Sequence, residues 1–279
     1  EGLEKGKRKF LIVQATGTGK TRVAMALIDV LLRSNRAQKI LFLADRKALR
    51  DQAYNEGFKI FFPNESKSKV YSGTLDKNSR LYASTIQTFM ECYQEFSPGD
   101  FDVIISDEAH RSIGGNSRAV FEYFVGYKLG LTATPKDYLK NIDPQKVSEK
   151  DPRAWERRQL LDTYTTFGCP SGEPTFRYSL LDGVKDGYLV NPIVADARTE
   201  ITTELLSEKG YSLMVENEEG IEEEQTFFQK DFERKFFSDK TNQIFCKTFL
   251  ENAIKDPISG EIGKSIIFCV SQKHASKIT

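Results

Sequence analysis

The segment from Gln14 to Thr21, QATGTGKT, constrains the fold of this chain more than any other. It lies between an apolar run, Phe10 to Val13, and an apolar stretch without Gly or Pro, Thr21 to Arg33, so the order is strand, glycine loop, helix. This is the order of a P-loop, in which backbone amides and the N-terminus of a helix point at phosphates. We therefore expect a parallel α/β sheet with a polyphosphate site at its carboxyl edge.

Each polar residue of this loop has an expected role. Lys20 would reach the β- and γ-phosphates of ATP, and the Thr21 hydroxyl would hold Mg²⁺. Gln14 stands where the strict pattern has Gly, a departure that leaves the core of the motif intact. A glycine-rich turn that binds nothing is the less favoured interpretation. The expected ATP-binding residues are Thr16, Gly17, Thr18, Gly19, Lys20 and Thr21.

A second signal ends the apolar run from Phe101 to Ser106, where Asp107, Glu108 and His110 follow. An Asp-Glu pair at a strand end is usually surface charge, but here it occurs in a chain that already has a P-loop. Asp107 would complete the Mg²⁺ shell opposite Thr21, and Glu108 would orient or deprotonate the attacking water. We therefore predict that Lys20, Asp107, Glu108 and His110 are catalytic and that the cofactors are ATP and Mg²⁺.

Other strands are expected to end at the same edge of the sheet. The run Lys39 to Ala44 reads as a buried strand, with Asp45 as the N-cap of the helix that follows. Arg46, Ser84, Thr85 and Gln87 lie at or just beyond strand ends, where they would contact DNA phosphates. Helix capping explains the hydroxyls of Ser84 and Thr85 as economically.

Two further hydroxyls, Thr132 and Thr134, end the expected strand that begins at Lys128. They would hydrogen-bond His110 and couple the nucleotide site to moving parts of the protein. Capping of a β-to-α turn is again the simpler alternative.

Composition limits the function less than the motifs do. The 279 residues include 40 Lys plus Arg and 40 Asp plus Glu, so any nucleic-acid surface must be local. The four cysteines are far apart and form no CxxC pair, which argues against a zinc ribbon or a disulfide framework. No apolar stretch is long enough to span a bilayer, and we expect a cytoplasmic protein with no membrane partner.

The length predicts two α/β domains, with a boundary at Asn191-Pro192. Residues 1–191 would form the first, with an irregular insertion over 136–175 that carries one short helix. Residues 192–279 would begin a second one with a buried strand, Gly263 to Val270, after an acidic loop or hairpin over 216–224. The chain is expected to be a fragment of something longer.

Three motifs together resemble motifs I, II and III of superfamily 2 helicases: Thr16 to Thr21, Asp107 to His110, and Leu131 to Pro135. Within that superfamily, the chain looks most like the motor part of the restriction (R) subunit of type I restriction enzymes. The further segments that carry this resemblance are Leu41 to Arg46, Ser84 to Gln87, Asp186 to Val190 and Ile266 to Cys269.

The resemblance implies a P-loop RecA-like domain followed by the start of a second one. It also implies an ATP-driven motor that translocates double-stranded DNA and works with the modification and specificity subunits of a restriction complex. The nuclease domain, the later helicase motifs and the catalytic arginine of such subunits would lie outside this chain, so the fragment itself would hydrolyse ATP hardly at all.

Two alternatives stay open at this point. One is a motor of another superfamily 2 protein, such as a type III restriction subunit, a repair translocase or an RNA helicase. The other is a module that binds nucleotide and docks on proteins without turnover, against which the water-positioning Glu108 argues.

Overall fold

A computed structural model describes residues 2–3, 6–71, 76–112, 114, 117–140, 153–192, 211–216, 222–227, 239–269 and 272–278 of the chain. The chain divides into two compact units, Glu1–Asn191 and Pro192–Thr279. In the part of the chain that the structure describes, no helix is both long and apolar enough to cross a membrane.

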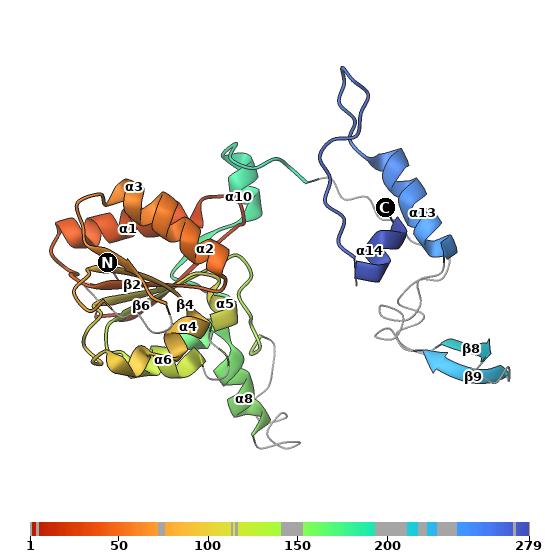
Figure 1. Cartoon of the computed structure of the whole chain (residues 1–279). Coiled ribbons are helices and arrows are strands. Elements are labelled where there is room, and N and C mark those ends of the chain that lie inside the picture. Colours follow the sequence, from red (N-terminus) through yellow and green to blue (C-terminus); the bar gives the residue numbers. More distant parts are fainter. Residues whose placement is uncertain are drawn as a thin grey trace. The chain divides into compact units, whose positions relative to one another are not determined.

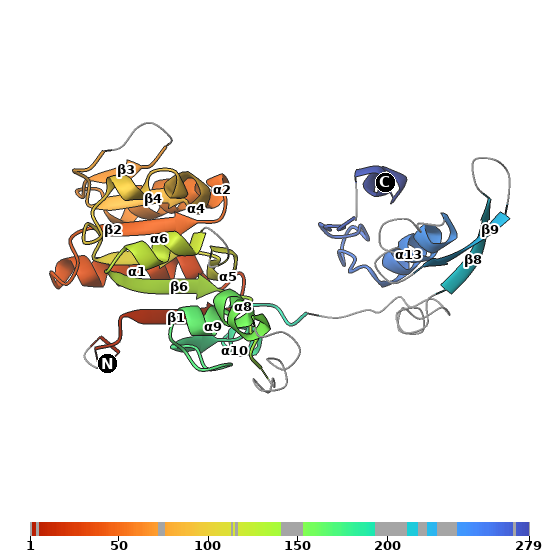
Figure 2. The ribbon, with the colours of Figure 1, turned by 90° about the horizontal axis from the view of Figure 1, so that it is seen from below.

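The first unit is built on a seven-stranded sheet in which every pair of neighbouring strands is parallel. The strand order is β3-β4-β2-β5-β6-β1-β7, so the strand before the P-loop lies one place from an edge (Figure 2). The α/β fold predicted from the sequence is confirmed. The strands are β1 (Lys9–Gln14), β2 (Ile40–Ala44), β3 (Lys67–Lys69), β4 (Leu81–Thr85), β5 (Val103–Ser106), β6 (Tyr127–Thr132) and β7 (Phe176–Tyr178).

Helices cover both faces of this sheet, as a sheet that is buried on both sides requires. On one face lie α1 (Lys20–Arg33), α2 (Lys47–Gln52), the π-helical turn η1 (Ala53–Phe58) and α3 (Lys59–Phe61) (Figure 1). On the other lie α4 (Ile86–Met90) and α6 (Ser117–Tyr123). The remaining helices of this unit are the 3₁₀ turn η2 (Tyr93–Glu95), α5 (Ala109–Ser112), α8 (Ala154–Leu161), α9 (Thr163–Thr166) and α10 (Leu180–Lys185).

The two faces have separate cores because successive side chains of a strand point to opposite sides. In β2, Phe42 packs into a cluster with Met25 and Ile28 of α1. Its neighbour Leu43 packs into a second cluster with Phe89 of α4 and with aromatic residues from the loops beyond it. All five residues of β2 are buried, which explains why this strand reads as an unbroken apolar run.

The predicted irregular insertion with one short helix is partly wrong, because residues 153–175 contain two helices, and the second of them, with the residue that ends it, is buried against the sheet. Tyr164 and Phe167 are buried against Leu11 of β1, and Phe167 occupies space that Gly130 of β6 leaves open. A Cβ atom added to Gly130 would lie 2.6 Å from Cζ of Phe167. Strand β7, which the sequence analysis missed, then pairs with β1 at the edge of the sheet.

The second unit differs from its prediction at the expected buried strand, Gly263 to Val270. Residues 263–269 form no strand, and Phe268 is 92% exposed. A parallel strand needs a neighbour for its backbone groups, and β8 (Tyr211–Glu216) and β9 (Glu222–Phe227) pair only with each other among the described residues. Of the predicted acidic segment 216–224, Glu216 and Glu222 to Glu224 lie in the antiparallel pair of β8 and β9, and residues 217–221 lie outside the described part. The helices are α13 (Asp239–Asn252) and α14 (Gln272–Ile278).

Candidate active site

The P-loop joins β1 to α1 with two glycines in left-handed conformations. Gly17 has φ 84° and Gly19 has φ 87°, values that favour glycine over any residue with a Cβ atom. Gly19 is also the N-cap of α1, and no side chain caps this helix end. The first amides of α1 thus lack a capping side chain, which is the arrangement that an anion at a helix N-terminus completes.

Gln14 occupies the position where the usual P-loop pattern has Gly, and its side chain hydrogen-bonds to the backbone of the loop. It is the last residue of β1 and 5% exposed, and its Nε2 donates a 2.9 Å hydrogen bond to the Thr18 carbonyl. The Thr18 hydroxyl in turn donates to the Ala15 carbonyl at 2.6 Å. The loop is therefore closed by its own side chains, and the departure from the pattern does not disturb the turn.

Asp107 follows β5 and is a buried carboxylate, only 5% exposed. Burial and, after it, the neighbouring charge of Glu108 raise the pKa of Asp107 above its usual range, and the nearby Lys20 offsets this only in part. Its Oδ1 accepts a 3.0 Å hydrogen bond from the Glu108 amide. A carboxylate buried with so little positive charge around it fits a cation ligand.

A single buried carboxylate such as that of Asp107 fits Mg²⁺ as its cation. Mg²⁺ commonly takes one or two protein carboxylates and completes its shell with phosphates and water. The described residues contain no cluster of three or more His, Cys, Asp or Glu side chains that could hold a metal.

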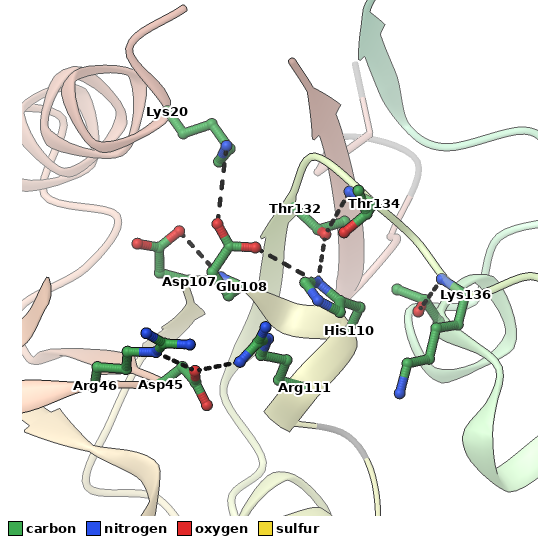
Figure 3. A network of polar contacts seen from close by, with 11 residues as sticks. Lys20, Asp45, Arg46, Asp107, Glu108, His110, Arg111, Thr132, Thr134 and Lys136 are labelled. Atoms are coloured by element: carbon green, nitrogen blue, oxygen red, sulfur yellow. Dashed lines mark hydrogen bonds and ion pairs between the residues drawn. The ribbon is translucent and has the colours of Figure 1, made fainter. Parts of the chain in front are cut away.

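Glu108 is held in an unusual backbone conformation, with φ 48°. Its side chain is 28% exposed and lies between two partners: Oε1 is 4.0 Å from Nζ of Lys20, and Oε2 is 3.5 Å from Nδ1 of His110 (Figure 3). A left-handed conformation at a non-glycine residue costs about 1–3 kcal/mol and occurs preferentially at functional sites. Here it aims the carboxylate from the strand end toward the P-loop lysine.

His110 connects the catalytic turn to the end of β6. Its Nδ1 lies 2.8 Å from the Thr132 hydroxyl, which also accepts a 3.1 Å hydrogen bond from the Thr134 amide. Burial lowers the pKa of His110, and the positive charge of Arg111 acts in the same direction, while the negative charge of Glu108 opposes them. The expected contact between His110 and Thr132 is present, whereas Thr134 takes part through its backbone.

The loop that follows Thr134 is fixed by residues that the sequence analysis left without a role. Lys136 and Thr163 exchange two 2.9 Å hydrogen bonds, from the Thr163 amide to the Lys136 carbonyl and from the Lys136 amide to the Thr163 hydroxyl. The fully buried Asp162 accepts from the Tyr138 amide at 2.8 Å. We call these contacts the clip of Lys136 and Thr163. No sequence signal marked them, because the residues that they join lie more than twenty positions apart in the chain.

The four predicted DNA-binding residues differ in accessibility. Arg46 and Gln87 are exposed at the carboxyl edge of the sheet. Ser84 is 0% exposed and its hydroxyl donates to the Thr85 carbonyl, while the Thr85 hydroxyl caps α4 by accepting from the Thr88 amide. In this structure the two hydroxyls serve the capping role that was the alternative, and only Arg46 and Gln87 are open to a ligand.

Asp45 does not cap the helix after β2, so that prediction is wrong. The N-cap is Arg46, in an extended conformation and without a side-chain cap. The Asp45 carboxylate is drawn instead to two arginines: its Oδ2 lies 3.5 Å from Nε of Arg46 and 3.3 Å from Nη1 of Arg111. Arg111, one turn beyond Glu108, is a site residue that the sequence analysis missed, although its place next to His110 was visible.

The segment after β7 also reaches the P-loop. The Leu189 side chain packs so closely that a Cβ atom added to Gly17 would lie 3.2 Å from its Cδ2. Its Cδ1 lies as near to Gly183 of α10. The positive φ at position 17 favours glycine, and a Cβ atom there would also require the Leu189 side chain to shift by a few tenths of an ångström.

Comparison with known proteins agrees with this geometry. Residues 1–137 match the family described as the res subunit of type III restriction enzymes. Over 100% of its length the chain is 28% identical to the endonuclease subunit of the type I restriction enzyme EcoAI from Escherichia coli, of which it covers 32%. It is also 28% identical over its whole length to the EcoKI endonuclease subunit from Escherichia coli (strain K12), of which it covers 24%.

The chain is thus similar over its whole length to the endonuclease subunits of two type I restriction enzymes. The resemblance predicted from the sequence is thereby confirmed. The chain spans about a third and about a quarter of the lengths of these two relatives. A solved structure described as a fragment of an HsdR subunit of a type I restriction enzyme from Vibrio vulnificus YJ016 is 29% identical, with a TM-score of 0.45 over 67% of this chain and 29% of that one.

Proposed function

We propose that this chain is the ATP-hydrolysing motor of a type I restriction R subunit and that it translocates double-stranded DNA. The observation that carries the proposal is the convergence of three side chains at one sheet edge. Lys20, the first residue of α1, lies 4.0 Å from Glu108 in the turn after β5, and Glu108 lies 3.5 Å from His110 in α5. Such a constellation has no structural need to exist, since a salt bridge of 4.0 Å between partly exposed side chains stabilises a fold very little.

The geometry suggests an order of events for the residues of this chain. Lys20 and Glu108 face each other across 4.0 Å, a distance at which each partially neutralises the other. When nucleotide phosphates take Lys20 as their counter-charge, Glu108 loses this partner and becomes free to orient the attacking water. Asp107 and the Thr21 hydroxyl would hold Mg²⁺, which supplies charge stabilisation for the transferred phosphoryl group.

A conformational change at Glu108 would then be transmitted through His110 to the end of β6. His110 Nδ1 contacts both the Glu108 carboxylate and the Thr132 hydroxyl. A movement of the Glu108 side chain would therefore alter the hydrogen bond between His110 and Thr132. The clip of Lys136 and Thr163 connects this region to α9, which packs against β1. Phosphoryl transfer and movement of a partner domain would be linked through this path.

Two variants of the complete R subunit, assembled with its modification and specificity subunits, test the catalytic assignment. Lys20→Ala should weaken binding of a fluorescent ATP analogue and abolish DNA-stimulated phosphate release, because Lys20 contacts phosphate in both ground and transition states. Glu108→Gln should leave nucleotide binding within about 3-fold and still lower phosphate release by about 10²-fold or more, because it acts only on the water.

Lys47→Ala is the matched control, since Lys47 is an exposed lysine at the start of a helix on the same edge. Its binding and turnover should be those of the unaltered protein. An equal loss of nucleotide binding in both Lys20→Ala and Glu108→Gln would contradict the assigned roles.

A type III restriction motor is the second candidate, favoured by the description of the family that residues 1–137 match. The modification and specificity subunits separate the two. Displacement of a triplex-forming strand from DNA that depends on a specificity subunit supports the type I assignment, whereas displacement without one supports the alternative. Equal movement on duplex RNA would contradict both.

A further inference from the structure

One carboxylate holds two arginines from different parts of the sheet edge. Asp45, at the end of β2, contacts Arg46 at the start of α2 and Arg111 in α5 (Figure 3). The three residues meet because β2 and β5 are neighbouring parallel strands, with Leu43 beside Ser106. The arginine side chains are 68% and 50% exposed, while Asp45 is 16% exposed. The cluster is a positively charged surface over a partly buried acid.

Asp45 leaves most of the hydrogen-bonding capacity of both arginines unused. The nitrogens that pair with it, Nε of Arg46 and Nη1 of Arg111, lie 3.5 Å and 3.3 Å from its Oδ2 atom, distances that are long for charge-assisted hydrogen bonds. A guanidinium has five N–H donors, and its planar fork matches the oxygens of a phosphate. With two positive charges and one negative charge, the cluster can bind an anion without displacing Asp45 entirely.

We propose that Arg111 binds a backbone phosphate of duplex DNA together with Arg46, and that Asp45 is the counter-charge with which this phosphate competes for the two arginines. This rests on the proposed function, to which it adds a DNA contact on the same helical turn as the catalytic glutamate. Phosphate is the favoured ligand because the cluster offers charge and forked donors but no apolar surface for a base.

The position of Arg111 gives this contact a mechanical consequence. Its amide donates a 2.9 Å hydrogen bond to the Glu108 carbonyl, so the backbone of the catalytic turn is tied to the residue that would hold DNA. Arg111 and Asp45 also act with opposite sign on the pKa of His110, which Arg111 lowers and Asp45 raises. A phosphate that draws Arg111 away from Asp45 therefore changes both the turn and the charge around His110.

The test is binding of a fluorescein-labelled 30-bp duplex to the full chain, measured by anisotropy from 50 to 200 mM KCl. Arg111→Ala should weaken binding by about 3- to 10-fold and lower the slope of log K against log salt by about 0.9, the value for one lost phosphate contact. Arg46→Ala should do the same. Arg33→Ala is the matched control: Arg33 is equally exposed and paired with one carboxylate, Asp29, but ends α1 at the opposite edge.

Two more variants test how the shape of the Arg111 guanidinium and the charge of Asp45 affect DNA binding. Arg111→Lys keeps the charge without the fork, so it should retain the salt slope while losing part of the affinity. Asp45→Asn removes the competing carboxylate, so it should tighten binding by about 2-fold or more and steepen the salt slope. Circular dichroism melts of every variant establish that the fold is kept.

Different failures have different meanings. Weakening by Arg46→Ala with Arg111→Ala equal to Arg33→Ala would overturn this inference and leave the proposed function standing. Absence of any duplex binding by the unaltered chain at 50 mM salt would overturn both. Tighter binding by single-stranded RNA than by the duplex, lost in Arg111→Ala, would overturn the choice of DNA as the ligand.

Discussion

Asp107→Asn should make this protein more stable at neutral pH while destroying its function. The Asp107 side chain is 5% exposed, and burial together with the Glu108 charge raises its pKa. Asparagine has the same shape and keeps the oxygen that accepts from the Glu108 amide, but it carries no charge to be desolvated. Relief of such a functional burden commonly stabilises a domain by about 0.5–2 kcal/mol.

The effect should be measurable by differential scanning fluorimetry. One kcal/mol corresponds to about 2–4 °C in Tm for a domain of this size, so a rise of several degrees is expected at pH 7 without Mg²⁺ or nucleotide. The pH dependence of this difference in stability tests the direction of the pKa shift. A carboxyl whose pKa is raised on folding binds protons more tightly in the folded state, so the unaltered protein gains stability as pH falls through that pKa, and the difference from Asp107→Asn should shrink.

A carboxylate with the opposite shift serves as the control. Hydrogen bonds from Lys69 and then Arg50 lower the pKa of Asp51, so Asp51→Asn should lower Tm at pH 7. That loss should disappear as pH falls, because the stability from a lowered pKa is itself lost there. A lower Tm for Asp107→Asn at pH 7, or a difference that does not change with pH, would refute the reasoning that Asp107 is a destabilising residue kept for a cation.

Two further predictions concern packing and His110. Gly130→Ala should destabilise the first unit by about 1–3 kcal/mol in urea denaturation, because the new Cβ atom would lie 2.6 Å from Phe167. Gly99→Ala is the control. Its Cβ atom would meet nothing within 4 Å, so its stability should change by less than about 0.5 kcal/mol. Equal effects of the two substitutions would contradict the packing of 153–175 on β6. His110→Asn should reduce the fall in stability below about pH 6.5. A His whose pKa is lowered on folding favours the unfolded state once that state takes up a proton. Identical profiles of stability against pH for the two proteins would show that burial does not lower the pKa of His110.

The sequence predicted those parts of the fold whose signals are local. Ile40 to Ala44 and the run before Asp107 are continuous and apolar because their strands, β2 and β5, are buried along their whole length. Phe10 to Val13 in β1 is equally apolar, with Leu11 buried and the other three residues half-buried. The P-loop and Asp107 to His110 were found because each is a short motif attached to such a strand. Strand ends that are near in the sheet need not be near in sequence, but parallel topology brings them together.

The parts that were missed depend on contacts between distant residues. Strand β7 has only three residues and pairs at the edge with β1, about 160 positions earlier in the chain. Residues 153–175 looked irregular because their burial rests on two aromatic residues, Tyr164 and Phe167, rather than on a periodic stripe. The expected strand at 263–270 failed for the opposite reason: its apolar pattern was strong, but no neighbouring strand accompanies it in the described part of its unit.

The capping role assigned to Asp45 failed through competition between local and distant partners. An aspartate directly before a helix usually accepts from the amides of the first turn. Here two guanidinium groups are within reach, and ion pairing with a charged donor is stronger than a hydrogen bond with a neutral amide. The second arginine, Arg111, comes from 66 residues further along the chain, so no local rule could have foreseen the outcome.

The positions at which local rules are broken gather at the nucleotide edge. Asp107 is a buried acid with a raised pKa, and Glu108 holds a left-handed conformation without being glycine. Oε1 of Gln14, at the base of the P-loop, is buried without a hydrogen-bond partner. Each of these features costs free energy in the chain alone, and a cation beside Asp107 would relieve the first of them. Since strain that served no purpose would be removed by a single substitution such as Asp107→Asn, its concentration here argues that the edge exists for binding and chemistry rather than for stability.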